Sequence, residues 1–181
     1  MPLPVFILGY QISAEFRSIF GSSIVYLPIT LGIVLVHWWG PRVLTPLYLT
    51  SIFLTQAWSY TVYAPLIATH DTVCVFASWL LYRKVGRGDC RLENVQELVK
   101  FLMLGVLIPI CINSLYYPFI FRVPSENWPD YWRHVSFLLL SDFTTCFAII
   151  VPLLFFLTPL MDRLGLTLRY SLVDRHPDLK T

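Results

Sequence analysis

Charged residues are scarce in this chain of 181 residues. They make up only 13% of it, against about 25% in an average soluble domain. Hydrophobic residues make up 56%, and the mean hydropathy is +0.65. This composition excludes an ordinary soluble domain, so the sequence predicts an integral membrane protein whose main surroundings are the lipid bilayer.

Sequence motifs of common active sites are also missing. The chain has no Ser-His-Asp pattern, no HExxH, no phosphate-binding loop and no GxGxxG. Its four cysteines, Cys74, Cys90, Cys111 and Cys146, lack CxxC or Cys/His spacing and are typical of small buried hydrophobic residues. We therefore expect no enzyme activity, no metal and no cofactor.

Two further signals are weak or absent. The net charge of +2 is too small to indicate a nucleic-acid partner. The N-terminus lacks the basic region and the small-residue cleavage site of a signal peptide. The first apolar segment is therefore expected to stay in the membrane.

What the chain does have is a series of apolar runs separated by glycine, proline and polar stretches. The breaks predict helices over residues 3–19, 22–39, 42–64, 66–84, 95–122 and 130–160. Since a spanning helix needs about 20 apolar residues, we predict an all-α integral membrane bundle of about six transmembrane helices. It would occupy residues 1–160, with a polar cytoplasmic tail or linker over residues 161–181. The first segment, which carries Glu15 and Arg17, could instead lie on the surface or re-enter.

The positions of Lys and Arg predict the orientation, because cytoplasmic loops hold most of the basic residues. With the N-terminus inside, only Arg17, Arg122 and Arg133 fall outside. This asymmetry favours six crossings with both termini in the cytoplasm.

Aromatic residues and prolines add detail to this layout. Trp38 and Trp39 end the second predicted helix, where we expect them at the headgroup level, and His37 beside them is expected to have a structural role at that interface. Five prolines fall inside predicted helices, and each should kink its helix and free a carbonyl that a neighbour satisfies: Pro28, Pro46, Pro109, Pro118 and Pro152.

Asp142 is the most informative polar residue, because it lies within the bilayer-length apolar segment 130–160. An ionisable group there costs roughly 2.5 to 3.5 kcal/mol on insertion scales and usually faces a partner, a ligand or a water-filled cavity. At about 1.5 Å per residue, Asp71 lies roughly 8 Å and Asp142 roughly 16 Å from the outer face.

Five deep polar side chains could line one ligand pocket open to the outside: Gln56, His70, Asp71, Asn113 and Asp142. Carboxylates would bind a cation or accept hydrogen bonds, and His70 would add pH sensitivity. The alternative is that these groups only hydrogen-bond one another between helices, as buried polar groups in membrane bundles commonly do.

Three runs of sequence resemble the type-one membrane-associated sensor (MASE) family. They are SSIVYLPITLGIVLVHWWGPRVLTPLYLTSIF (22–53), ATHDTVCVFASWLLYRK (68–84) and WRHVSFLLLSDFTTCFAIIVPLLFF (132–156). Gly40, Pro41 and Arg42 correspond to the family's turn between helices, and Asp142 and Pro152 to its Asp and Pro positions. The likeness covers the N-terminal part of the family's domain, so it implies a fragment or a shortened form.

The resemblance implies a bacterial input domain in the inner membrane, fused ahead of a histidine kinase, a diguanylate cyclase or a related output domain. It would detect an unknown small-molecule stimulus and pass the signal to its cytoplasmic partner, with a homodimer expected by analogy with sensor kinases. In this reading the ligand-binding residues would be the deep polar set, and Pro152, Gly40, Pro41 and Arg42 would transmit the signal or support the fold.

Two other functions are consistent with the residues. One is the substrate-binding S-component of an energy-coupling-factor vitamin transporter, which also has six helices and about this length. The other is a structural assembly subunit, in which Asp142 would hydrogen-bond between helices and no ligand would bind.

Overall fold

A computed structural model describes residues 2–20, 26–59, 64–88, 92, 94–122 and 128–167. Every element in this part of the chain is helical, which confirms the predicted all-α class. The elements are α1 (Leu3–Phe20), α2 (Leu27–Trp39), η1 (Gly40–Val43), α3 (Leu44–Ser59), α4 (Ala64–Trp79), η2 (Leu80–Val85), α5 (Val95–Lys100), η3 (Phe101–Leu107), α6 (Ile108–Arg122), α7 (Trp128–Pro152), η4 (Leu153–Leu157) and α8 (Thr158–Arg163).

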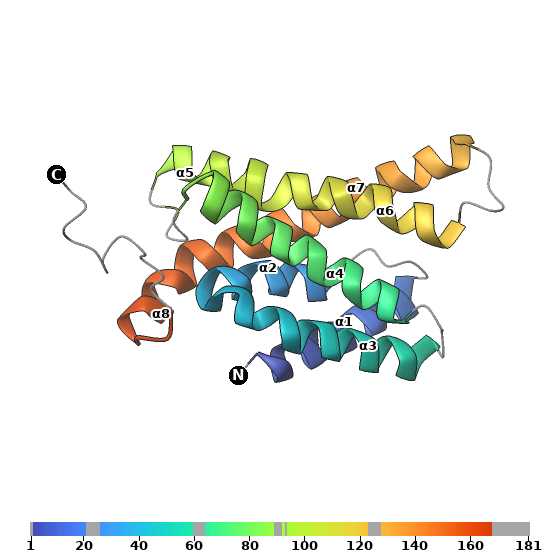
Figure 1. The fold of residues 1–181 in the computed structure, drawn as a ribbon, viewed down its shortest axis with the longest axis horizontal. Helices are drawn as coiled ribbons and strands as arrows, with labels where there is room; N and C mark the ends of the chain where they lie inside the picture. The colour runs from blue at the N-terminus through green and yellow to red at the C-terminus, as the bar shows by residue number, and fades with distance from the viewer. Residues whose placement is uncertain are drawn as a thin grey trace.

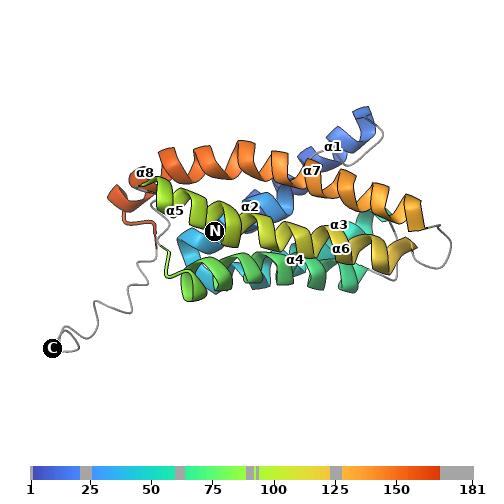
Figure 2. The same ribbon diagram turned by 90° about the horizontal axis from the view of Figure 1, so that it is seen from above.

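The long helices lie roughly along one another in an elongated bundle (Figures 1 and 2). Four helical stretches are long and apolar enough to cross a membrane: Leu27–Gln56, Ala64–Val85, Val95–Tyr116 and Trp128–Arg163. Leu3–Phe16 is a shorter apolar helix. Parts of three predicted breaks lie outside the described residues: Gly21, residues 89–91 with Cys90, and residues 124–127. Residues 22–25 and 60–63 of predicted helices and the tail from residue 168 onward also lie outside them.

Within the stretch Leu27–Gln56 the chain reverses direction at η1, so α2 and α3 form a hairpin (Figure 1). Gly40 has φ 70°, a left-handed conformation that glycine adopts without a steric penalty. Pro41 follows in the first turn of η1, where a missing N–H costs nothing. The turn predicted at Gly40, Pro41 and Arg42 is therefore present.

Helix α2 lies at the centre of the bundle and contacts α1, α4 and α7. All but two of its side chains are buried, Leu31 and Trp39 being the exceptions. A helix that is hydrophobic all round is surrounded by protein or by lipid, and here neighbouring helices surround α2, which supplies much of the core.

The prolines behave in two ways. Pro28 and Pro46 lie within α2 and α3, as predicted, but in their first turns. Pro28 fits there because first-turn N–H groups have no partner within the helix. Pro109 and Pro152 do lie inside long helices, beside the π-helical segments η3 and η4. The Pro118 side chain lies outside the described residues.

The carbonyl that Pro109 leaves without its usual helical donor belongs to Gly105, four residues earlier. The Ser78 hydroxyl from α4 donates a hydrogen bond to this carbonyl. The expectation that a neighbouring helix satisfies a freed carbonyl is thus met at Pro109.

Helix α8 continues past the predicted end at residue 160 and stops at Arg163. Gly165, with φ 64°, donates its N–H to the carbonyl of Asp162, and Leu166 donates to the carbonyl of Met161. This pair of hydrogen bonds is a Schellman motif, which ends a helix and fixes the direction of the following chain.

Candidate functional site

Asp71 on α4 is the centre of a buried polar cluster. Its Oδ2 accepts hydrogen bonds from the hydroxyls of Tyr26 at 2.7 Å, Tyr10 at 3.0 Å and Ser51 at 3.0 Å. Asp71 is only 2% exposed, and the Tyr26 hydroxyl also donates to that of Tyr10 at 3.2 Å. One carboxylate oxygen therefore connects three helices, α1, α3 and α4. It also connects them to Tyr26, the residue before α2.

The sequence of α4 places Asp71 inward because its buried residues recur every three or four positions. This buried stripe consists of Ala64, Ala68, Asp71, Val75 and Ser78. Two alanines at one end let neighbouring backbones approach closely, as small residues do in membrane helix packing. Asp71 and Ser78 then meet polar partners on other helices instead of lipid.

His70 and Cys74 extend the polar cluster along the next stripe of α4. His70 Nδ1 lies 3.7 Å from Asp71 Oδ1, and its Nε2 lies 3.8 Å from Cys74 Sγ. The imidazole stacks on the Tyr116 ring, with centroids 5.0 Å apart and planes 4° from parallel. The Cys74 thiol in turn donates to Asn113 Oδ1 at 4.0 Å. Contacts to sulfur at these distances are weak, so this is the loosest part of the set.

Asp142 on α7 is the last member of this polar cluster. Its Oδ2 accepts a hydrogen bond from the side-chain amide of Asn113 at 2.7 Å. Asn113 is buried, whereas Asp142 is half-buried. The structure thus brings together four of the five residues predicted to line a ligand pocket: His70, Asp71, Asn113 and Asp142. We call these four, together with Tyr10, Tyr26, Ser51 and Cys74, the polar network.

Gln56 does not belong to the polar network, because its side chain is exposed on α3. The residues that sequence reasoning missed are the three hydroxyl donors and Cys74. Tyr10 offered a signal, since it lies in the middle of an apolar helix and away from the interfaces where membrane tyrosines usually lie. Ser51 and Tyr26 gave no such signal.

The polar network has the chemistry to exchange hydrogen bonds and protons or to bind a cation. It combines two carboxylates, an imidazole, a thiol, an amide and three hydroxyls. Within the described part of the chain, no group of three or more His, Cys, Asp or Glu residues is placed to hold a metal ion. Cys74, Cys111 and Cys146 are free thiols, and Cys74 and Cys146 are buried, as predicted.

The opposite end of α2 contacts the C-terminal end of the bundle, which consists of α8 and the residues that follow it up to Leu166. We call this segment the exit of the bundle. The Trp38 indole N–H donates to the Thr158 hydroxyl at 2.9 Å, and the Trp39 indole N–H donates to the Leu166 carbonyl at 2.7 Å. Trp38 is buried by the protein, and its predicted place at the headgroup level stays a prediction. The indole N–H needs a partner when it is buried, and α8 supplies one.

His37 lies one residue before these tryptophans and is 1% exposed. Its ring contacts those of Tyr82 and Phe101, with centroids 5.4 and 5.3 Å away. Both ring nitrogens are buried without a hydrogen-bond partner among the described residues, while its backbone carbonyl accepts a bond from Arg83 at 3.0 Å. The imidazole is thus enclosed by aromatic rings, and its expected interfacial level stays a prediction.

No family model matches the chain, and no curated protein or solved structure is significantly similar to it.

Proposed function

We propose that this chain is the membrane-embedded input domain of a bacterial signalling receptor. The observation that carries the proposal is the position of α2 between two sets of contacts. Tyr26, immediately before α2, hydrogen-bonds Asp71 in the polar network, whereas Trp38 and Trp39 at its other end hydrogen-bond the exit of the bundle. A change at one end can therefore reach the other through one helix.

The polar network suits a stimulus-sensing role because it joins helices through groups that can change partners. A stimulus that competes for Asp142, or that alters the bonds around Asp71, would change which helices the network holds together. Such a stimulus shifts the bundle between two packings only if it binds them with different affinities. Asp142 is the carboxylate that a ligand can reach more easily, since it is half-buried and has one described side-chain hydrogen bond, whereas Asp71 is buried.

The signal would leave through α7 and α8, which form one continuous helical stretch with η4 between them. Helix α2 touches this stretch twice: the Thr30 hydroxyl lies 3.4 Å from Cys146 Sγ, and Trp38 bonds Thr158. Pro152 lies between these two contacts, at the junction with η4. We infer that Pro152 and the η4 segment let α8 shift relative to α7.

The finer parts of this function remain proposals that rest on the basic residues and the family resemblance. They are six crossings of the inner membrane, both termini in the cytoplasm, a kinase or cyclase output domain as partner and a homodimer. The topology is tested by reporter fusions after Gly88 and after Pro124. We expect the first to report a cytoplasmic position and the second an external one.

The function itself is tested by Asp142→Ala in a receptor that carries its output domain. We expect the response to the stimulus to be lost while the protein remains folded and in the membrane. The matched control is Asp130→Ala, since Asp130 is an exposed carboxylate in the first turn of the same helix. A normal response in Asp142→Ala would reject the proposed role of Asp142.

The S-component of a vitamin transporter is the alternative. It predicts that the purified chain binds a small vitamin tightly and docks onto a separate transport module. Tight vitamin binding by the chain alone, with no output domain in the receptor, would favour that function over ours.

A further inference from the structure

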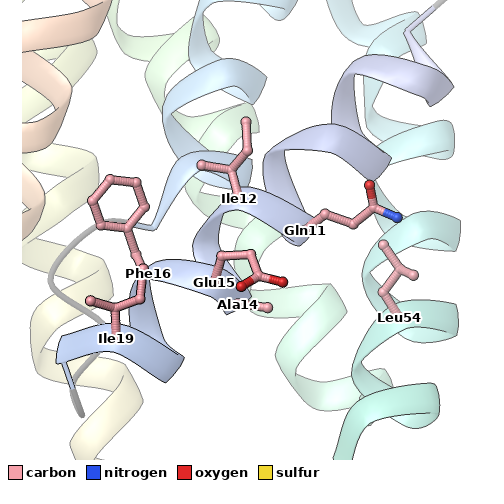
Figure 3. Close-up of a pocket in the computed structure, with 7 residues that line it drawn as sticks. All are labelled: Gln11, Ile12, Ala14, Glu15, Phe16, Ile19 and Leu54. Atoms are coloured by element: carbon pink, nitrogen blue, oxygen red, sulfur yellow. The ribbon is translucent and has the colours of Figure 1, made fainter.

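A groove on the outer surface of the bundle lies between α1 and α3, apart from the polar network. Its volume is about 560 Å³. It is lined by α1 side chains between Gln11 and Ile19, with Leu54 of α3 opposite. Figure 3 shows the Glu15 carboxylate and the Gln11 amide among the apolar side chains of Ile12, Phe16, Ile19 and Leu54. The groove is therefore apolar with two polar groups.

The groove lies on the face of α1 that is directed away from the core. The buried residues of α1 are Phe6, Gly9, Tyr10 and Ser13, whereas Leu8, Gln11, Ile12, Glu15 and Ile19 are exposed. In a helix of 3.6 residues per turn these two sets occupy opposite sides. In a membrane-embedded bundle, the side that carries Glu15 faces the lipid.

Apolar side chains extend from the groove along α1 toward the middle of the bundle. Ile12, which lines the groove, is 44% exposed, and Leu8 is 57% exposed. The two are spaced by four residues, so they lie one above the other on one face of α1. They form a track along α1 that suits an acyl chain.

In the predicted topology, where α1 ends at the outer membrane surface, Glu15 lies close to that surface. It is five residues before the end of α1 at Phe20, which at about 1.5 Å per residue is roughly 8 Å along the helix axis. A carboxylate that faces lipid at this level is stabilised by a cation from the headgroup layer, because unpaired charge in hydrocarbon is costly. The depth and the charge therefore select a lipid headgroup that carries a positive charge.

We propose that this groove binds a phospholipid with a primary ammonium headgroup, its acyl chain lying along the track of Ile12 and Leu8 on α1. A primary ammonium has three N–H donors, and the Glu15 carboxylate and the Gln11 amide oxygen, which both line the groove, are acceptors for them. A quaternary ammonium lacks N–H groups, and an anionic headgroup would meet Glu15 with like charge. The site is independent of the input-domain proposal.

The test is native mass spectrometry of the full chain purified in detergent. Phosphatidylethanolamine, phosphatidylcholine and phosphatidylglycerol with identical acyl chains are titrated separately. We expect phosphatidylethanolamine to bind most tightly. Glu15→Gln should raise its Kd about tenfold, the effect of one charge-assisted hydrogen bond. Ile12→Trp, which fills the track without changing charge, should also weaken binding.

The control is Asp130→Asn, which removes the same charge from an exposed site on α7 and should leave the Kd unchanged. Equal affinity for the three lipids would overturn the headgroup assignment. Wild-type binding by both Glu15→Gln and Ile12→Trp would overturn the groove as the site. A groove filled by a second copy of the chain would instead give a dimer that the added lipid does not dissociate.

Discussion

Asp71 and Asp142 are the same residue type in the same helical bundle, but their surroundings differ. Asp71 is 2% exposed and accepts three hydroxyl hydrogen bonds, whereas Asp142 is half-buried and has one described side-chain hydrogen bond. In the most apolar part of the helical stretch Trp128–Arg163, which carries Asp142, only 22% of the residues are buried. Number of partners and burial thus distinguish a carboxylate that holds helices together from one that is free to change partners.

The largest expected effect is that of Asp71→Ala. It removes three side-chain hydrogen bonds, each worth about 0.6–1.7 kcal/mol in a membrane protein, and it leaves the hydroxyls of Tyr10, Tyr26 and Ser51 buried without their acceptor, which adds to the cost. We predict that the free energy of unfolding in detergent falls by more than about 3 kcal/mol. Asp130→Ala, at an exposed position, should change it by less than about 0.5 kcal/mol. Equal effects of the two variants would refute Asp71 as the anchor of the bundle.

Tyr26→Phe removes only the shortest of the three bonds and keeps the ring. It should lower the free energy of unfolding by about 1.5 kcal/mol. Tyr116→Phe is the matched control, because its hydroxyl is on an exposed residue and the ring that stacks on His70 is retained. If Tyr26→Phe proves as stable as the control, the Asp71 cluster does not depend on the residue before α2.

Asp142→Ala should affect stability much less than Asp71→Ala does, but it should have a large effect on output. Single side-chain hydrogen bonds in membrane proteins average about 0.6 kcal/mol, so the free energy of unfolding should fall by about 1 kcal/mol or less. In a receptor with its output domain, the same variant should abolish the response. A loss of stability as large as that of Asp71→Ala would show that the two carboxylates play the same structural role.

His37→Phe extends the comparison to a buried polar group whose ring nitrogens have no hydrogen-bond partner. Phenylalanine matches the aromatic contacts with Tyr82 and Phe101 and removes the two unsatisfied nitrogens. We therefore expect a gain of about 0.5–1 kcal/mol in the free energy of unfolding. A loss instead would mean that the imidazole has a partner in the membrane, such as an ordered water.

Much of the fold could be predicted from the sequence, because apolar runs and their breaks are local features. The helix from residue 95 to residue 122 and the turn at Gly40 were predicted closely. The second helix begins at Leu27 and not at the predicted residue 22, because helix start signals are weak within a continuous apolar run. The burial of Trp38 was missed because a tryptophan near a helix end has the same sequence signature whether it faces headgroups or the core.

The candidate site was predicted only in part. Asp71, Asn113 and Asp142 were found because polar side chains are conspicuous in apolar helices. Their hydroxyl partners were not, because Tyr10 and Ser51 are 61 and 20 residues from Asp71 in sequence and neither is charged. The rotation of each helix decides which deep polar residues face inward, and the sequence does not give this rotation. Gln56 was therefore included among the predicted pocket residues although it lies outside the polar network.

The central claim, that α2 connects the polar network to the exit of the bundle, is tested most directly by hydrogen exchange. The amides of Gly165 and Leu166 report on the Schellman motif that Trp39 holds through the Leu166 carbonyl. In lipid nanodiscs, Tyr26→Phe should speed the exchange of these two amides, as Trp39→Phe should do directly. Unchanged exchange at Gly165 and Leu166 in Tyr26→Phe, with faster exchange in Trp39→Phe, would contradict the account.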